Sequence, residues 1–362
     1  AVYEGTFRPK ESGAYELLIE GDDGYRVYVN GEKVIDYWGE HASAKREYTL
    51  KAIAGTDYKI RIEYMQAGAE ALLRFDLGVY RHISPEMVVD RVKEADIVIF
   101  AGGISPSLEG EEMYSVNSPG FAGGDRTSIE LPQVQRDILK ALKKAGKKVV
   151  FVNCSGSAVA LVPEMESCDA ILQAWYPGQA GGLAVADVLF GDFNPSGKLP
   201  VTFYKNTDQL PDFEDYSMKN RTYRYMTEVP LFPFGYGLSY TTFDISKGRL
   251  NKADKKTMTA DDTISFPVNV KNTGKYDGAE VIQVYVRKVD DAEGPIKSLR
   301  AFRRVPLKAG ETCVVSIDLL PTTFEFFDPT TNTMRIMPGK YEIMYGNSSD
   351  IPSGNKLSVT LR

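Results

Sequence analysis

Three patterns of hydrophobic and polar positions follow one another along the chain. In residues 1 to about 80, apolar and polar side chains alternate in runs such as "GAYELLIE", "YRVYVNGEKVID" and "YKIRIEYM", with turn sequences such as "EGDDG" between them. Alternation with a period of two is typical of strands that bury one face. The first pattern therefore predicts a mostly antiparallel β-sandwich.

The second pattern begins near Ser84 and has a helical period. The stretch "PEMVVDRVKEAD" leads into the apolar run "IVIFAGG", and "LPQVQRDILKALKKAG" leads into "KKVVFVN". A third short run, "AILQAW", precedes the helical stretch "QAGGLAVADVLFG". Helices that alternate with short β-branched strands are typical of a parallel sheet covered by helices. This part is predicted to be an α/β sandwich with a mostly parallel sheet.

The third pattern returns to alternation after about Thr242, in runs such as "TISFPVNVKNTG", "AEVIQVYVRKV" and "TCVVSIDLL". Turn signals recur about every 8 to 12 residues, which is typical of an immunoglobulin-like β-sandwich. The predicted architecture is multidomain, with a β-sandwich in residues 1–82, an α/β sandwich in 83–243 and an immunoglobulin-like sandwich in 244–362.

Size and charge restrict the partners that the chain can have. Its 362 residues are enough for two or three domains with separate cores. The formal net charge is -6 and no cluster of Lys or Arg forms a basic patch, which argues against nucleic acid as a partner. No apolar run approaches the roughly 18 residues of a membrane span, so no membrane partner is expected. The expected partner is small or neutral.

Carboxylates are the main candidates for acid–base chemistry. The chain has two histidines and three widely separated cysteines, Cys154, Cys168 and Cys313. These numbers argue against a reaction centred on histidine, a zinc site or a disulfide framework. No metal and no cofactor is therefore expected.

An acidic loop follows the apolar run "IVIFAGG". It places Glu109, Glu111 and Glu112 within four positions of "SLEGEEM". Ligands of an open parallel sheet bind beyond the carboxyl ends of its strands, and neighbouring carboxylates raise the pKa of a glutamate so that it stays protonated as a general acid. A merely solvated acidic loop is the alternative, although a loop of this length inside a compact domain is more often functional.

Two further segments flank this loop in the predicted fold. Asp125 or Arg126 is expected to hold the loop by ion pairs or backbone hydrogen bonds, and Thr127 or Ser128 is a candidate cap for the helix that begins near Pro132. In "AWYPGQAGG", Trp175 and a tyrosine follow another strand.

Several long motifs resemble one known family. The stretches "SLEGEEM…GGDRTSIELPQVQ", "AWYPGQAGGLAVADVLFGDFNPSGKLPVTFY", "NRTYRY" and "PLFPFGYGLSYTTF" look like the C-terminal half of a family 3 glycoside hydrolase, the β-glucosidase and β-xylosidase family. The last 120 residues resemble that family's fibronectin type III-like domain. The first 80 are similar to the protective-antigen-type sandwich that some members insert into their α/β domain.

The resemblance implies a retaining mechanism with two carboxyl groups about 5 Å apart. In this family an aspartate nucleophile lies on an N-terminal TIM barrel, and a glutamate acid/base lies on the α/β domain. The acid/base maps to "LEGEEM", with Glu111 as the first choice, Glu109 as the second and Glu112 as the third. Glu112 and Trp175 are also expected to contact substrate, and aromatic rings near the loop would stack on sugar rings.

The chain also departs from the family pattern, because no barrel and no nucleophile motif are present and no initiator Met begins the sequence. We therefore expect one segment of a larger enzyme, whose partners are an N-terminal TIM-barrel segment and a β-linked oligosaccharide ending in xylose or glucose. A homo-oligomer and a secreted or periplasmic location are compatible with the resemblance. The alternative function is a noncatalytic carbohydrate-binding or interaction module.

Overall fold

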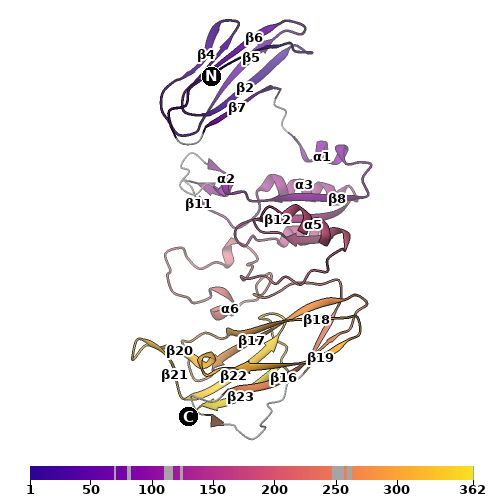
Figure 1. Cartoon of the computed structure of the whole chain (residues 1–362), viewed down its shortest axis with the longest axis vertical. Coiled ribbons are helices and arrows are strands. Elements are labelled where there is room, and N and C mark those ends of the chain that lie inside the picture. Colours follow the sequence, from indigo (N-terminus) through magenta and orange to yellow (C-terminus); the bar gives the residue numbers. More distant parts are fainter. Residues whose placement is uncertain are drawn as a thin grey trace. The chain divides into compact units, whose positions relative to one another are not determined.

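The computed structural model describes residues 1–68, 71–79, 83–109, 117–122, 125–246, 257–258 and 263–361. The chain divides into two compact units, Ala1–Ser84 and Pro85–Arg362, and each is described by itself (Figure 1). Within the described ranges, no helix combines the length and the apolar character needed to cross a membrane.

The first unit consists of two antiparallel sheets. One has the order β1 (Val2–Phe7), β6 (Tyr58–Tyr64), β3 (Tyr25–Val29), β4 (Glu32–Tyr37), and the other has the order β5 (Ala44–Ala52), β2 (Gly13–Asp22), β7 (Leu72–Gly78). Alternate residues of these strands turn inward, and Leu17, Ile19 and Val27 are fully buried between the sheets. The predicted β-sandwich is confirmed.

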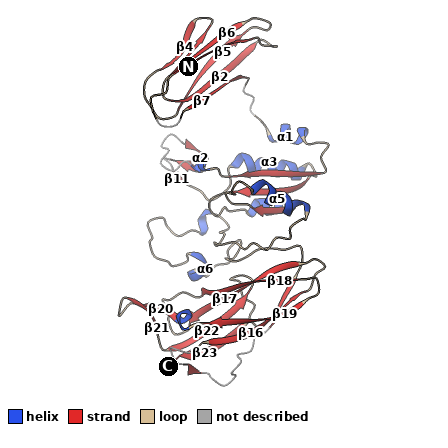
Figure 2. Ribbon diagram, viewed as in Figure 1, coloured by secondary structure: helices blue, strands red, loops and turns tan. Residues whose placement is uncertain are grey.

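The second unit begins with a parallel sheet of three strands in the order β13 (Ala170–Gln173), β12 (Lys148–Cys154), β8 (Ile97–Gly103) (Figure 2). The helices that alternate with these strands are α1 (Pro85–Arg91), α3 (Gln133–Lys144), α4 (Val162–Ser167) and α5 (Gly181–Phe190). The predicted parallel α/β arrangement is confirmed, although the first helix ends earlier than its apolar pattern.

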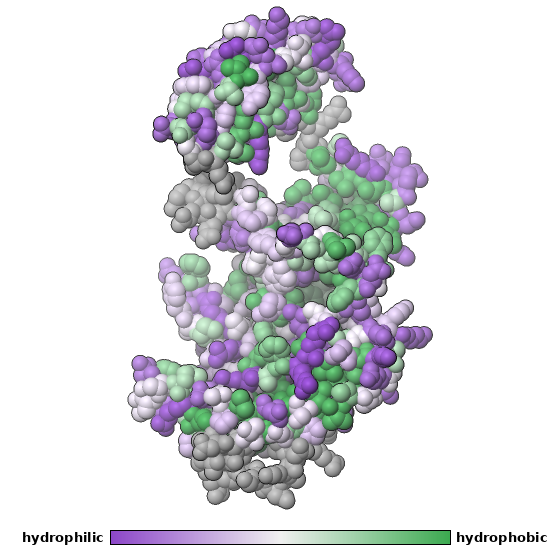
Figure 3. All heavy atoms as spheres, viewed as in Figure 1, coloured by the Kyte–Doolittle hydropathy of each residue, from purple (hydrophilic) through white to green (hydrophobic). Residues whose placement is uncertain are grey.

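The two faces of this sheet differ in how well they are covered. On one face, Leu139 of α3 and Val149 and Phe151 of β12 are fully buried in one cluster. On the other face, Ile97 and Ile99 of β8 are 57% and 52% exposed. Hydrophobic residues gather on the surface over β8 and α5 (Figure 3). Parallel sheets are normally covered on both faces, so the described residues leave this apolar surface incompletely covered.

The chain ends in a second β-sandwich. One sheet contains β14 (Phe243–Ser246), β16 (Ile264–Asn272) and β19 (Thr312–Leu319), and the other contains β15 (Thr257–Met258), β23 (Lys356–Leu361), β22 (Gly339–Gly346), β17 (Gly278–Lys288) and β18 (Ser298–Leu307). A hairpin of β20 (Glu325–Asp328) and β21 (Thr333–Ile336) follows the short helix η2 (Pro321–Phe324). Phe266, Ile282 and Val284 are fully buried in its core.

The α/β region and the C-terminal sandwich are packed against each other. The side chain of Gln283 donates a hydrogen bond of 3.0 Å to the carbonyl of Gly235. The ammonium of Lys198 lies 2.7 Å from the carboxylate of Glu280, and both side chains are largely buried. These contacts explain why the two regions form one compact unit.

Candidate active site

The acidic loop leaves the sheet at Gly103, the last residue of β8. Gly103 has φ of +125°, and a Cβ added there would lie 1.9 Å from the carbonyl oxygen of Cys154. The side-chain amide of Gln135 on α3 binds both backbone groups of Gly103: its Nε2 donates to the carbonyl over 2.7 Å, and its Oε1 accepts from the N–H over 2.8 Å. Strand β12 and helix α3 therefore fix the start of the loop.

Replacing Gln135 with leucine is expected to lower the free energy of unfolding by about 1–3 kcal/mol, because the partly buried polar groups of Gly103 lose their partner. Urea denaturation of the full-length protein measures this loss. Gln133 on the same helix bonds only to the exposed Asp137, so Gln133→Leu is the matched control and is expected to change stability by less than about 0.5 kcal/mol. Equal losses in the two variants would contradict the role of Gln135.

Glu109 ends the short helix α2 (Pro106–Glu109), which directly follows β8. The hydroxyl of Tyr176, on the segment after β13, donates to the carbonyl of Ile104 over 2.7 Å and contacts Oε2 of Glu109 at 3.4 Å. Burial and the negative charge of Glu109 raise the pKa of Tyr176, so this phenol stays a hydrogen-bond donor at neutral pH. A Cβ on Gly156, after β12, would lie 2.6 Å from the Tyr176 ring.

Arg126 joins the same group from the short strand β11 (Asp125–Arg126), which pairs with β10 (Phe121–Ala122) beside β9 (Asn117–Ser118). Its guanidinium donates to the hydroxyl of Ser157 over 2.8 Å and to the carbonyl of Ser128 over 3.2 Å. Arg126 thus makes one hydrogen bond to the backbone and one to a side chain, and its role in holding the acidic loop stays a prediction. Burial lowers the pKa of Arg126, and the charge of Glu109 opposes that shift.

These contacts gather residues from three strand ends at one edge of the sheet. Glu109 follows β8, Ser157 follows β12 and Tyr176 follows β13, while Arg126 lies among them. An ionisable carboxylate, a phenol and a guanidinium in one place are suited to proton transfer and to binding hydroxyl groups.

The structure describes one of the other predicted site residues, Trp175. Glu111 and Glu112 are outside the described residues. Trp175 is half-buried with φ of +58°, and its ring packs edge-on against Phe203 at 6.0 Å between ring centres. The indole therefore contributes to the apolar cluster of the α/β region. Its contact with substrate stays a prediction.

Sequence reasoning missed a buried polar network at the same strand ends. Asn153 is fully buried, and its amide donates to the side chains of Gln173 over 2.6 Å and Ser155 over 3.3 Å. The signal for it in the sequence is a polar residue near the end of two mainly apolar strands, Asn153 in "KVVFVNC" and Gln173 in "AILQ". The network ties the end of β12 to the end of β13.

Glu130 was missed as well. Burial opposes its ionisation, but hydrogen bonds from Ser128 and from the hydroxyl and backbone N–H of Thr207 lower its pKa to about 2. Glu130 thereby anchors the helix η1 (Thr207–Gln209) close to the segment that contains Arg126. The predicted cap at Thr127 or Ser128 is wrong, because helix α3 follows Pro132 without any side-chain cap.

A metal site has no ligand set in the described ranges, where no three His, Cys, Asp or Glu side chains converge.

Residues 23–240 match the Glycosyl hydrolase family 3 C-terminal domain, and residues 280–349 match the Fibronectin type III-like domain. A xylan 1,4-beta-xylosidase of Xylanibacter ruminicola is 52% identical over 100% of this chain and 41% of its own length. A periplasmic beta-glucosidase of Salmonella typhimurium is 38% identical over 74% of this chain and 35% of its own length.

Solved structures agree with these relatives. One is the crystal structure of a beta-glucosidase from Kluyveromyces marxianus in complex with glucose, which has a TM-score of 0.75 and 28% sequence identity to this chain. The match covers 100% of this chain and 44% of the beta-glucosidase chain. The chain thus spans less than half the length of the relatives it matches. Its family model covers more than half of the chain and includes the sheet edge with Glu109 and Arg126, so the chain belongs to glycoside hydrolase family 3 and corresponds to the C-terminal part of such an enzyme.

Proposed function

We propose that this chain supplies the general acid/base of a retaining exo-β-glycosidase, which removes terminal xylose or glucose from β-linked plant-wall oligosaccharides. The observation that carries the proposal is the acidic loop itself. It starts at Gly103, whose backbone is held by hydrogen bonds from Gln135. Its first glutamate, Glu109, lies beside Tyr176 and Arg126 at the carboxyl edge of the sheet. Membership of family 3 supports the reaction class.

In this proposal Glu111 is the acid/base and Glu109 is the second choice. Glu111 protonates the glycosidic oxygen while an aspartate of the N-terminal barrel attacks the anomeric carbon. Glu111 then removes a proton from the water that releases the sugar from that aspartate. Tyr176 and Arg126 hold Glu109 and bind hydroxyl groups.

The N-terminal segment is the second part of the proposal. Such a segment would supply the nucleophile and cover the exposed apolar surface over β8 and α5. Ile97, Ile99, Leu183 and Phe190 are each more than half exposed on these elements. An uncovered apolar surface beside a parallel sheet supports a partner that packs there.

Xylose is the proposed preference, because the xylan 1,4-beta-xylosidase is 52% identical to the whole chain. The test is hydrolysis of aryl β-xyloside and aryl β-glucoside by the full-length enzyme. We expect the larger kcat/KM for the xyloside and β-xylose as the first product. A larger kcat/KM for the glucoside would reverse the sugar preference. Hydrolysis of neither substrate would contradict the proposed function and favour a noncatalytic module.

A further inference from the structure

The segment between η1 and the short helix α6 (Thr222–Tyr225) presents two aromatic rings to solvent. We name residues 211–221 the aromatic loop. Phe213 is 91% exposed and Tyr216 is 89% exposed, which makes them the most exposed large hydrophobic side chains in the described ranges. Singly exposed aromatic residues are common, but two exposed rings on one short loop are typical of a surface that binds a ligand or another molecule.

The aromatic loop has a fixed shape although it is exposed. The guanidinium of Arg221 donates to the backbone carbonyls of Asp212 over 3.1 Å, Asp215 over 2.5 Å and Ser217 over 3.1 Å. The carboxylates of Asp212 and Asp215 each accept a backbone N–H two residues further on, over 2.8 Å. A loop held this way presents Phe213 with little ordering cost on binding.

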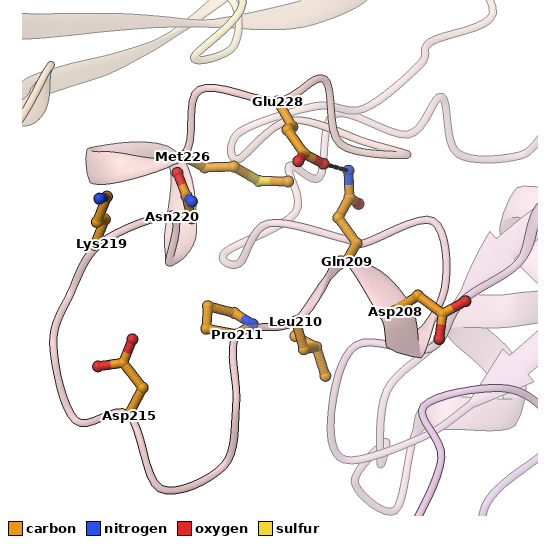
Figure 4. A pocket seen from close by; sticks show the side chains of 9 residues that line it. All are labelled: Asp208, Gln209, Leu210, Pro211, Asp215, Lys219, Asn220, Met226 and Glu228. Carbon is orange, nitrogen blue, oxygen red and sulfur yellow. Dashed lines mark hydrogen bonds between the residues drawn. The ribbon is translucent and has the colours of Figure 1, made fainter.

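A hollow of about 210 Å³ lies beside the aromatic loop (Figure 4). On one side, the amide of Gln209 donates to the carboxylate of Glu228 over 3.2 Å. Asp215 and Lys219 lie on the opposite side. The positive charge of Lys219 interacts electrostatically with the carboxylate of Asp215, so the two side chains give this wall both a cation and an anion. The side chain of Met226 adds an apolar part to the wall.

The chemistry of the hollow selects a neutral ligand with many hydroxyl groups. Hydroxyls both donate and accept, which suits carboxylates and an ammonium in one wall. Carboxylates at Asp208, Asp215 and Glu228 disfavour an anion, and the ammonium of Lys219 disfavours a cation. Pockets for drug-sized ligands usually have volumes of about 300 Å³ or more. The hollow is smaller than that and has room for about one sugar ring. The aromatic loop lines part of this hollow through Pro211, Asp215 and Lys219, and flat apolar rings on the same loop are suited to the C–H faces of further sugar units.

Hydrogen bonds of Thr207 connect the wall of the hollow to the segment that follows the acidic loop. The hydroxyl of Thr207, at the start of η1, accepts the backbone N–H of Ile129 over 3.1 Å and donates to the carboxylate of Glu130. Residues 208–211 of the wall follow directly.

We propose that the hollow and the aromatic loop form a binding site for a neutral β-linked oligosaccharide, with one sugar ring in the hollow and further units on Phe213 and Tyr216. The identity of the sugar rests on the proposed function. The site would hold long substrates and contribute nothing to the reaction of small ones.

The test is the double variant Phe213→Ala/Tyr216→Ala in the full-length enzyme. We expect KM for xylohexaose to rise about tenfold, since two aromatic contacts of about 0.7 kcal/mol each correspond to that factor. Retention in gels that contain soluble xylan is expected to fall in parallel, whereas kcat/KM for aryl β-xyloside stays unchanged. The single variant Lys219→Ala is expected to raise the same KM through the hollow alone.

The matched control is Tyr276→Ala/Phe302→Ala, which removes two rings that are 63% and 71% exposed on the C-terminal sandwich. Unchanged xylan retention and KM in the aromatic-loop variant would overturn the site. A changed oligomeric state in size-exclusion chromatography would overturn it in favour of a protein interface. An equal loss of kcat/KM with aryl β-xyloside would overturn it in favour of a structural role. Weaker retention in a protein that hydrolyses no glycoside would uphold the site and contradict only the proposed function.

Discussion

Replacing Glu111 with glutamine is expected to slow hydrolysis of xylobiose by the full-length enzyme about 10²–10⁴-fold. The sugar that leaves xylobiose is a poor leaving group and needs a proton on the glycosidic oxygen. An activated aryl alcohol leaves without that proton, so the first step on an aryl β-xyloside is expected to change far less. The two kcat/KM values, measured on the same preparation, report this difference, because kcat/KM covers the steps up to formation of the sugar–aspartate ester.

The neighbouring glutamates are the controls for this experiment. Glu109→Gln keeps the hydrogen-bonding shape beside Tyr176 and removes one negative charge, so a smaller loss of about tenfold is expected on both substrates. Glu112→Gln is expected to raise KM more than it lowers kcat. If Glu109→Gln instead gives the large loss confined to xylobiose, the acid/base is Glu109. If none of the three does so, the acidic loop does not carry this role.

Replacing Arg136 with methionine is expected to destabilise the protein by about 3–5 kcal/mol. The guanidinium of Arg136 lies 3.0 Å from the carboxylate of Glu164, whose side chain is only 1% exposed, and it also donates to the carbonyl of Ala160. Without Arg136, Glu164 remains as a buried charge with no partner. Urea denaturation at neutral pH measures the loss.

The pH dependence of this variant follows from Glu164. Burial raises the pKa of Glu164 above its ordinary 4.5 despite the attraction of Arg136, so in the variant the pKa rises further. Below pH 4.5 the group is protonated in both states and the variant loses least. As pH rises from 4.5 towards the raised folded pKa, the unfolded state ionises first and stability falls.

The double variant Arg136→Met/Glu164→Leu is the control for the ion pair. The double variant is expected to regain most of the lost free energy of unfolding, because a buried ion pair can be replaced by apolar residues of similar volume with little loss of stability. A single variant that loses less than about 1 kcal/mol, or a double variant no more stable than the single one, would contradict a buried pair.

Periodicity predicted the elements of this chain well where the apolar signal is strong. The run "IVIFAGG" forms β8, and the amphipathic stretch after Pro132 forms α3 with Leu139 and Leu142 fully buried. The helix at Pro85 was predicted too long, and it ends at Arg91 with no fully buried residue. A helix without a fully buried residue ends where local signals weaken, and the hydrophobic period alone does not show how deeply a helix is buried.

The site was predictable only in its location. The acidic loop follows a strand, and parallel strands place such loops at one edge, so Glu109 was found by position. Gln135 binds Gly103 from 32 residues away, and Glu130 binds Thr207 from 77 residues away. Such partners meet only after the chain folds, and no local pattern marks them. Tyr176 was placed near the loop by its strand end, but its bond to Ile104 was not predictable.

Mass spectrometry of the Glu111→Gln enzyme during turnover of an activated aryl β-xyloside tests the central claim most directly. Loss of the general base slows the attack of water on the sugar–aspartate ester more than it slows formation of that ester. The intact mass is therefore expected to rise by one sugar residue, with a burst of released aryl alcohol. Rapid steady turnover with no added mass would contradict the claim that this loop carries the acid/base.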